Sequence, residues 1–134
     1  MKVGFTGTQK GMTWQQIKEV NREILLLSPS EFHHGDCIGA DEEAQKIAYR
    51  LSCSIHIHPP IISTKRAFTS GNVLYMPKPY LERNHDIVNA VYVLIACPKG
   101  KETLRSGTWA TIRYAISKKI RTIIIYPNGV IERR

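Results

Sequence analysis

The fold is decided by a stretch in which a short strand passes through a glycine turn into a helix, Glu31-Phe32-His33-His34-Gly35-Asp36-Cys37-Ile38-Gly39-Ala40-Asp41. Residues 31–34 suit a strand, and the glycines that follow interrupt it. Apolar residues then recur at helical spacing as far as Leu51, so a helix follows the turn. The stretch therefore predicts one strand–turn–helix unit of an α/β protein.

The same order of elements recurs on both sides of this stretch. Residues 3–6 form a strand that ends in the Gly7–Gly11 turn, and a helix covers roughly 13–27, where Thr13-Trp14-Gln15-Gln16 is a capping box. Further strands are expected at 53–58, 91–96 and 122–126. Further helices are expected at 80–90 and 106–119. We predict one Rossmann-like, three-layer α/β domain spanning 1–134, with a parallel sheet of about five strands. Trp14 and Trp109 are expected in its core, although Trp109 could instead contact a base.

Residues 59–78 do not fit this alternation. They contain Pro59-Pro60, Lys65-Arg66 and Ser70-Gly71-Asn72, with only a weak apolar patch at 73–76. Loops of this length inside a domain are usually functional or mobile. We expect an inserted loop or small hairpin here, or a lid over the ligand edge of the sheet.

Composition and charge narrow the class of protein. Apolar residues make up 43% and charged residues 22%, as in ordinary globular chains. No apolar run reaches the roughly 18 residues of a membrane span, and the three cysteines form no CxxC pair, so we expect a cytoplasmic protein that does not enter membranes. Residues 1–58 carry a net charge of −1, whereas 59–134 carry +9. This asymmetry favours an anionic partner, although a solubilising surface would also account for it.

Ligands of open parallel sheets bind at the carboxyl ends of the strands. Three segments should meet there, namely 7–9, 35–41 and 99–108, and two of them run into helix N-termini that favour phosphate. The candidate binding residues in and beside these segments are Gly7, Thr8, Gln9, Gly35, Gly39, Asp41, Arg83, Asn84, Ser106, Gly107 and Thr108.

Two of these residues have alternative interpretations. Arg83 could clamp a phosphate or carboxylate with two parallel hydrogen bonds, or it could form a surface ion pair with Asp86 or Glu82. Asp41 and Asn84 could hold ribose hydroxyls, or they could brace the loops.

Several other functions lack their sequence signatures. There is neither a GxGxxG nor a GxxxxGK[ST] motif, which argues against a dinucleotide redox enzyme or a P-loop NTPase. Histidines at 33, 34, 56 and 58, with Asp36 and Cys37 nearby, match no known ligand spacing, so no metal site is predicted. Ser106 and Cys97 lack the surroundings of a nucleophile and are expected to be structural.

Four short motifs in order resemble the SLOG superfamily of Rossmann-like domains, whose members include the DNA-processing protein A core and the "lonely guy" phosphoribohydrolases. They are the Gly7-Thr8 turn, the G-x-x-x-G-x-D pattern of 35–41, the Arg83-Asn84 pair and the S-G-T-x-x-T-x-R helix start of 106–113. The resemblance implies a nucleotide or nucleotide-derived ligand at the strand ends and is compatible with a homodimer. We expect no cofactor.

Departures from these relatives leave three functions open. The phosphoribohydrolases carry a catalytic Glu where this chain has Thr111, so an N-glycosidic hydrolase would have to use Asp36, Asp41 or Glu82. The helix start is closer to the DNA-processing protein, and a basic, aromatic strip could bind single-stranded DNA: Lys65, Arg66, Phe68, Tyr75, Lys78 and Tyr80. However, Gln9 replaces the Arg of that family. We therefore expect a nucleotide-binding or sensing module, with hydrolase and DNA binder as alternatives, and we assign no catalytic residue.

Overall fold

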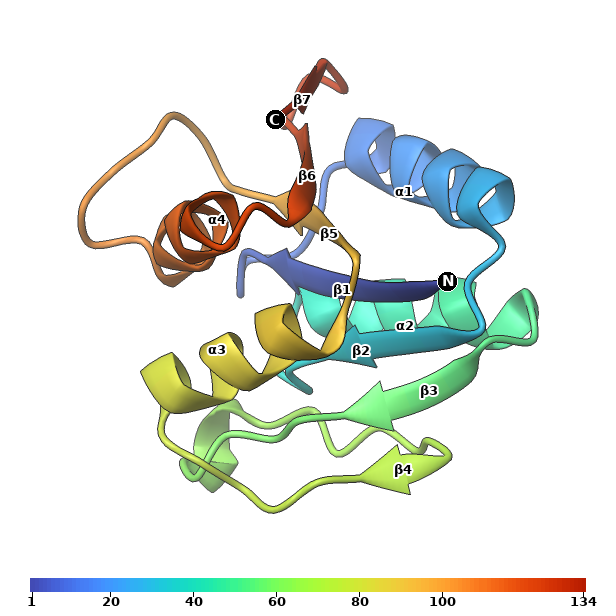
Figure 1. Ribbon diagram of the computed structural model, residues 1–134, viewed down its shortest axis with the longest axis vertical. Helices are drawn as coiled ribbons and strands as arrows, with labels where there is room; N and C mark the ends of the chain where they lie inside the picture. Colours follow the sequence, from blue (N-terminus) through green and yellow to red (C-terminus); the bar gives the residue numbers. More distant parts are fainter.

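Seven strands form one sheet, in the order β4-β3-β2-β1-β5-β6-β7, in the computed structural model, which describes all of residues 1–134 (Figure 1). All neighbouring strands are parallel except β7, which runs antiparallel to β6. The strands are β1 (Lys2–Gly7), β2 (Glu31–His34), β3 (Ser54–Ile57), β4 (Val73–Leu74), β5 (Val93–Cys97), β6 (Arg121–Ile125) and β7 (Ile131–Arg133).

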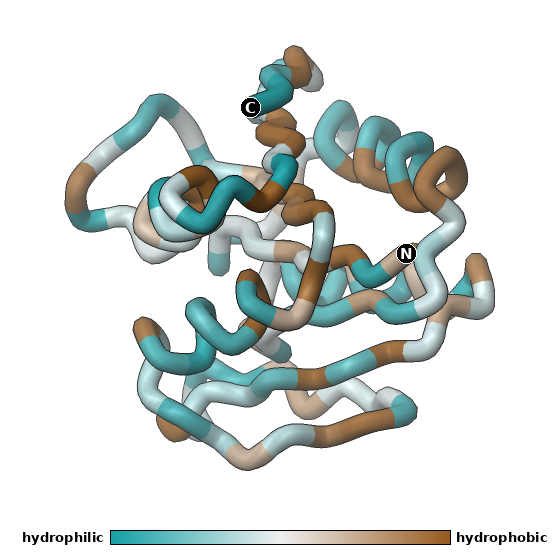
Figure 2. The backbone as a smooth tube through the Cα atoms, in the orientation of Figure 1, coloured by the Kyte–Doolittle hydropathy of each residue, from teal (hydrophilic) through white to brown (hydrophobic).

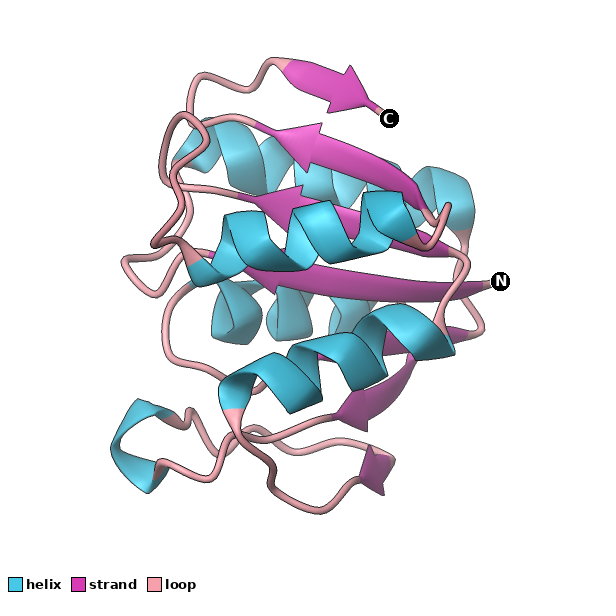
Figure 3. Ribbon diagram, turned by 60° about the vertical axis from the view of Figure 1, so that its left-hand side comes forward, coloured by secondary structure: helices cyan, strands magenta, loops and turns pink.

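The four helices cover the sheet in two pairs, which confirms the predicted three-layer α/β architecture (Figures 1 and 3). Helices α1 (Trp14–Leu27) and α2 (Ala40–Arg50) lie on one face, and α3 (Tyr80–Ala90) and α4 (Gly107–Ser117) lie on the other. The predicted capping box at the start of α1 is present, since Thr13 and Gln16 each accept a backbone N–H of the other. No helix combines the length and the hydropathy that crossing a membrane requires.

The expected strand number was too low, because both edge strands are short and weakly patterned. Strand β4 has two residues, which are 37% and 63% exposed, so no buried alternation marks it in the sequence. Strand β7 has three residues, two of them charged, and it follows a turn at Asn128-Gly129. Edge strands bury little side-chain area and therefore leave little hydropathy signal.

The inserted segment 59–78 is an edge of the sheet rather than a hairpin. After a 3₁₀ turn at Ser63–Lys65, it returns to pair β4 with β3 in parallel, with His56 beside Val73. Buried Asp36, directly after β2, fixes the segment in place: its carboxylate accepts from the Arg66 guanidinium at 2.7 Å and from the Thr69 amide at 2.9 Å.

The main core lies between the sheet and the pair α1 and α2, where Phe5, Phe32 and Ile24 are fully buried. Figure 2 shows α1 alternating between hydrophobic and hydrophilic segments, as an amphipathic helix does. A smaller cluster on the other face contains Trp109, which is 2% exposed and confirmed as core. The expectation for Trp14 was wrong: at the first position of α1 it is 69% exposed, because the packed stripe begins one turn later.

Candidate functional site

A pocket of about 380 Å³ opens where the direction of strand addition reverses, beyond the carboxyl ends of β1 and β5. The chain adds β2, β3 and β4 on one side of β1, and then returns to place β5 on the other side. The loops that follow β1 and β5 separate at such a point, which leaves a crevice between them. The sheet order therefore places a ligand-sized pocket at the edge expected from the sequence.

All the predicted binding residues except Gly39 line this pocket. They come from the end of β1 and its loop, the β2 loop, the starts of α2 and α4, and α3, and they are Gly7, Thr8, Gln9, Gly35, Asp41, Arg83, Asn84, Ser106, Gly107 and Thr108. Gly39, the residue before α2, lies behind the Gln9 backbone instead. Its ligand-binding role remains a prediction, as do those of the other residues.

The β1 loop is held closely against α2. A Cβ on Gly7 would lie 2.6 Å from the Cβ of Ala40, so only glycine lets the helix start this close to the strand end. Thr8 is engaged within the loop: its N–H donates to the Cys97 carbonyl at 3.1 Å, and its carbonyl accepts from Ala40 N–H at 3.0 Å. Gln9 reaches across the pocket to the Tyr80 hydroxyl at 3.2 Å.

Asp41 is the one carboxylate in the pocket wall. It accepts a hydrogen bond from Cys37 N–H at 3.1 Å, and it is 5% exposed. Burial raises the pKa of Asp41, against the opposing effects of His34 and Arg83. The other carboxylates considered from the sequence lie elsewhere: Asp36 braces the inserted segment, and Glu82 is an exposed partner of Lys78 at 3.8 Å.

The turn after β2 is organised by the hydrogen bonds of His34. His34 Nδ1 accepts from Asp36 N–H at 2.9 Å, and Nε2 faces the Gln45 carbonyl oxygen at 2.5 Å. The ring therefore suits the neutral form with its proton on Nε2, and burial lowers the pKa of His34 below its ordinary 6.5.

We predict that the free energy of unfolding falls as the pH drops below about 6.5, because the unfolded chain then takes up a proton that folded His34 does not. Each such histidine contributes a slope of about 1.4 kcal/mol per pH unit. Chemical denaturation between pH 7.5 and 4.5, measured with a chelator present, checks this. The slope should be smaller in a His34→Gln variant, and an equal slope would contradict the prediction.

Arg83 is the most distinctive side chain of the pocket, because its guanidinium is buried without a carboxylate partner. The residue is 4% exposed, and its partners are the carbonyls of Gly35 and His58, the Asn84 side-chain oxygen and the Cys37 sulfur. The predicted alternative of a surface ion pair is wrong, since Glu82 and Asp86 both pair with Lys78. A buried cation is costly unless an anion compensates for it. Asp41 lies near the guanidinium without hydrogen-bonding to it and supplies part of this compensation, and an anionic ligand would supply more.

The start of α4 offers backbone donors to the same pocket. Ser106 caps the helix by accepting from Trp109 N–H at 3.1 Å, as its expected structural role requires. The amides of Gly107 and Thr108 have no acceptor within the protein. Free amides and the positive end of the helix dipole favour an anion here. Trp109 supports this part of the pocket from the core. Its indole N–H donates to Gly100 O at 3.1 Å and so holds the loop before α4.

The charge of the pocket wall is strongly positive. Besides Arg83 it contains Lys10, Lys99 and Arg105, against the single carboxylate of Asp41. These three cations were not among the predicted site residues, although Lys99 and Arg105 lie in the predicted 99–108 segment. For Lys99 and Arg105 the sequence signal was the net charge of +9 of residues 59–134, which does not identify particular residues. Lys10 lies in the other half of the chain, whose net charge is −1, so the charge balance gave no signal for it.

Most side chains of the basic, aromatic strip considered for DNA binding form contacts within the protein. Arg66 pairs with buried Asp36 and lies 4.5 Å above the ring of Phe68, and Lys78 pairs with Asp86 at 2.7 Å. Tyr75 stacks on His58, with ring centroids 4.2 Å apart. Of the six residues, only Tyr80 lines the pocket.

The fold and the site together describe a doubly wound α/β protein with a cationic pocket at its topological switch point. Among solved structures, the chain is similar to the molybdenum cofactor binding protein of Rippkaea orientalis, with a TM-score of 0.73 and 19% identity over 93% of this chain and 76% of that one. It is also similar to the molybdenum cofactor carrier protein of Chlamydomonas reinhardtii, with a TM-score of 0.66 and 16% identity over 92% and 75%.

A third similar structure is TM1055, with a TM-score of 0.64 and 15% identity over 90% of this chain and 71% of that one. At these identities the likeness shows a shared fold. The sequence matches no family model and no curated protein sequence.

Proposed function

We propose that this protein binds an anionic nucleotide or nucleotide-like cofactor in the pocket between β1 and β5. Its phosphate would lie between the guanidinium of Arg83 and the free amides of Gly107 and Thr108. The observation that carries the proposal is the burial of Arg83, which lines the pocket with no carboxylate among its partners. A phosphate would balance the excess of cations over the single carboxylate of Asp41 and accept from both sides.

The remaining wall suits the rest of such a ligand. Hydroxyl groups of Thr6 and Thr103 and the amides of Gln9 and Asn84 can bond to ribose or to ring edges, and Tyr80 offers an aromatic face. Burial raises the pKa of the Cys37 thiol, so this sulfur is an uncharged part of the pocket wall. The pocket therefore favours binding through phosphate and polar groups.

The structural neighbours support the same class of ligand, since two of them are described by their binding or carriage of the molybdenum cofactor. We therefore include a phosphorylated heterocyclic cofactor, represented by a phosphorylated pterin, among the candidate ligands. A role in carrying or sensing such a molecule requires no catalytic group, and the pocket has only Asp41 as a carboxylate.

A thermal-shift panel at constant ionic strength tests the proposal. The panel contains nucleoside mono- and diphosphates, cyclic nucleotides, ADP-ribose, a phosphorylated pterin and a short single-stranded oligonucleotide. A ligand at 100 times its Kd adds about 2.7 kcal/mol of stability, which a melting curve resolves. Stabilisation by a small molecule supports the proposal. Stabilisation by the oligonucleotide alone would contradict it and favour DNA binding.

Gly107→Pro is the variant that tests the position of the phosphate most directly. Proline is well tolerated at the first position of a helix and removes only the N–H. Ser106 already has the extended conformation that a residue before proline requires, and a Cβ at Gly107 would meet nothing within 4 Å. We expect affinity to fall by roughly 10- to 100-fold, because a hydrogen bond to a charged group contributes about 1.5–3 kcal/mol.

Gly107→Ala is the matched control, because it adds a similar Cβ but keeps the N–H. The control should lose clearly less affinity than Gly107→Pro when both are titrated with the best ligand of the panel. Equal affinity of the two variants would place the phosphate elsewhere. Chromatography of the ligand after incubation shows in addition whether any N-glycosidic bond is cleaved.

A further inference from the structure

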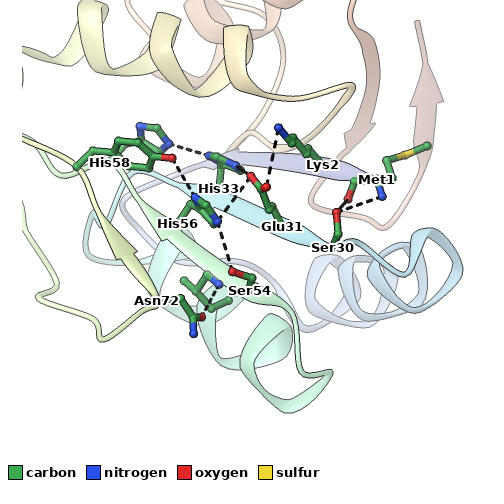
Figure 4. A network of polar contacts seen from close by, with 11 residues as sticks. Met1, Lys2, Ser30, Glu31, His33, Ser54, His56, His58 and Asn72 are labelled. Carbon is green, nitrogen blue, oxygen red and sulfur yellow. Dashed lines mark hydrogen bonds and ion pairs between the residues drawn. The ribbon is translucent and has the colours of Figure 1, made fainter.

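A second cluster of polar side chains lies on the β2 and β3 strands, on the side of the sheet that faces α3 (Figure 4). The parallel register places His33 directly beside His56, and their rings stack with centroids 4.4 Å apart. Because side chains alternate along a strand, Glu31 shares the face of His33, and His58 shares the face of His56. None of these residues lines the pocket.

We propose that Glu31, His33 and His56 form a binding site for a divalent transition-metal ion, with zinc as the best fit. Glu31 Oε1 lies 2.9 Å from His33 Nε2 and 3.6 Å from His56 Nε2. All three ligand atoms lie within 4.8 Å of one another. Ligand atoms bound tetrahedrally to zinc lie about 3.3 Å apart, so small side-chain shifts would complete the geometry.

The second nitrogen of each imidazole is already held by a partner. His33 Nδ1 lies 2.8 Å from His58 Nε2, and His56 Nδ1 lies 3.0 Å from the Tyr75 hydroxyl. With Nδ1 as donor in both rings, each Nε2 presents its lone pair to the same point beside Glu31. Metal-binding histidines usually have such a partner, which fixes the tautomer and the ring orientation. His58 in turn stacks on Tyr75, so the supporting groups also hold one another.

Within the protein, the hydrogen bond available to His56 Nε2 is long. If His33 Nε2–H donates to Glu31 Oε1, His56 Nε2 has only the Ser54 hydroxyl at 3.4 Å as a hydrogen-bonding partner. A metal ion would accept both Nε2 lone pairs and the carboxylate oxygen together. Two imidazoles and one carboxylate are a zinc ligand set that leaves a fourth position for water, and the Glu31 side chain is 28% exposed, so solvent can reach it.

The sequence pointed to histidines but not to this set. His34, Asp36 and Cys37 were the neighbours considered there, and the structure places all three away from the cluster. His34 points to the opposite face, toward Gln45, and Asp36 pairs with Arg66. The missing ligand is Glu31, which only the strand register brings beside His56.

Zinc titration by calorimetry tests the proposal on the chelator-treated protein, with Co²⁺ as a spectroscopic probe of coordination. We expect one equivalent of Zn²⁺ to bind, and visible d–d absorption of Co²⁺ that Zn²⁺ abolishes. Glu31→Gln and His56→Asn should each weaken zinc binding by at least about 100-fold. Tyr75→Phe removes only a supporting hydrogen bond and should cost about 10-fold.

His85→Asn and Cys53→Ser are the matched controls. His85 lies on α3 against Tyr114, outside the cluster, and Cys53 is a partly exposed thiol that could bind zinc by itself. Both variants should bind zinc as the wild type does. Circular dichroism is used to check that each variant is folded. Glu31→Gln alters a partly exposed residue, so its fold should be kept.

Absence of one-equivalent zinc binding in the wild type would overturn the proposal. Binding that survives both Glu31→Gln and His56→Asn, or that is lost in either control, would equally place the metal elsewhere. Because the readout is metal binding, these outcomes are independent of whether the nucleotide-like ligand binds the pocket.

Discussion

Replacing Arg83 with methionine is expected to weaken the binding of a phosphate-bearing ligand by roughly 30-fold to several-thousand-fold. Methionine keeps much of the volume of the side chain but removes the buried positive charge. Loss of one partner from a buried, hydrogen-bonded charge pair costs about 2–5 kcal/mol, which is far more than an exposed pair contributes. Titration of the wild type and the variant with the best ligand of the thermal-shift panel measures the difference.

Arg83→Lys and Arg113→Met complete this comparison. Lysine keeps the charge but not the planar fork that reaches both carbonyls and a phosphate, so its affinity should be intermediate. Arg113 is partly exposed and pairs with Glu102 at 3.0 Å, outside the pocket lining, so its loss should leave the affinity unchanged. If Arg83→Met binds as tightly as Arg113→Met, the guanidinium does not contact the ligand.

Stability must be followed in the same variants, because Arg83 also supports the fold. Its guanidinium donates to the carbonyls of Gly35 and His58, which follow β2 and β3. Leaving buried carbonyls without donors costs about 1–3 kcal/mol each, so Arg83→Met should also melt at a lower temperature. Binding is therefore compared at a temperature where each variant is folded.

The alternation of strands and helices was predictable from the sequence because most elements are marked at both ends. The Thr13 and Gln16 capping box begins α1, as the sequence indicated, and Ser106 lies at the predicted start of α4, where it caps the helix. Buried strands such as Val93–Cys97 are continuous apolar runs, which are easily recognised. The position of the pocket then follows from the strand order. The loops at the carboxyl ends of the strands diverge where that order reverses, which is between β1 and β5.

What the sequence did not reveal depends on contacts between distant segments. The burial of Arg83 depends on carbonyls of Gly35 and His58, which only the folded sheet brings together. Glu31 lies near His56 only in the observed strand register, because a shift by one residue would turn its side chain to the opposite face of the sheet. Trp14 satisfies the helical period by sequence, yet the first turn of α1 extends beyond the surface that covers it.

The largest effect on stability is expected at Gly39, which was predicted to bind ligand but lies behind the pocket wall. Its φ is +91°, and a Cβ there would lie 2.6 Å from the carbonyl carbon of Gln9. Gly39→Ala should therefore combine backbone strain, at about 1–3 kcal/mol, with a clash that the Gln9 loop must relieve. We expect a loss of about 3 kcal/mol, or roughly 10 °C in Tm.

Gly107→Ala is the matched substitution for this prediction too. Gly107 lies in the same pocket region but at the start of α4, where a Cβ meets nothing within 4 Å and helical backbone suits alanine. Its melting temperature should equal or slightly exceed that of the wild type. Similar melting temperatures for the two alanine variants would show that the Gln9 loop yields to Gly39→Ala at little cost. A large loss confined to Gly39→Ala would instead show that the close contact between Gly39 and Gln9 fixes the β1 loop, and with it this wall of the pocket.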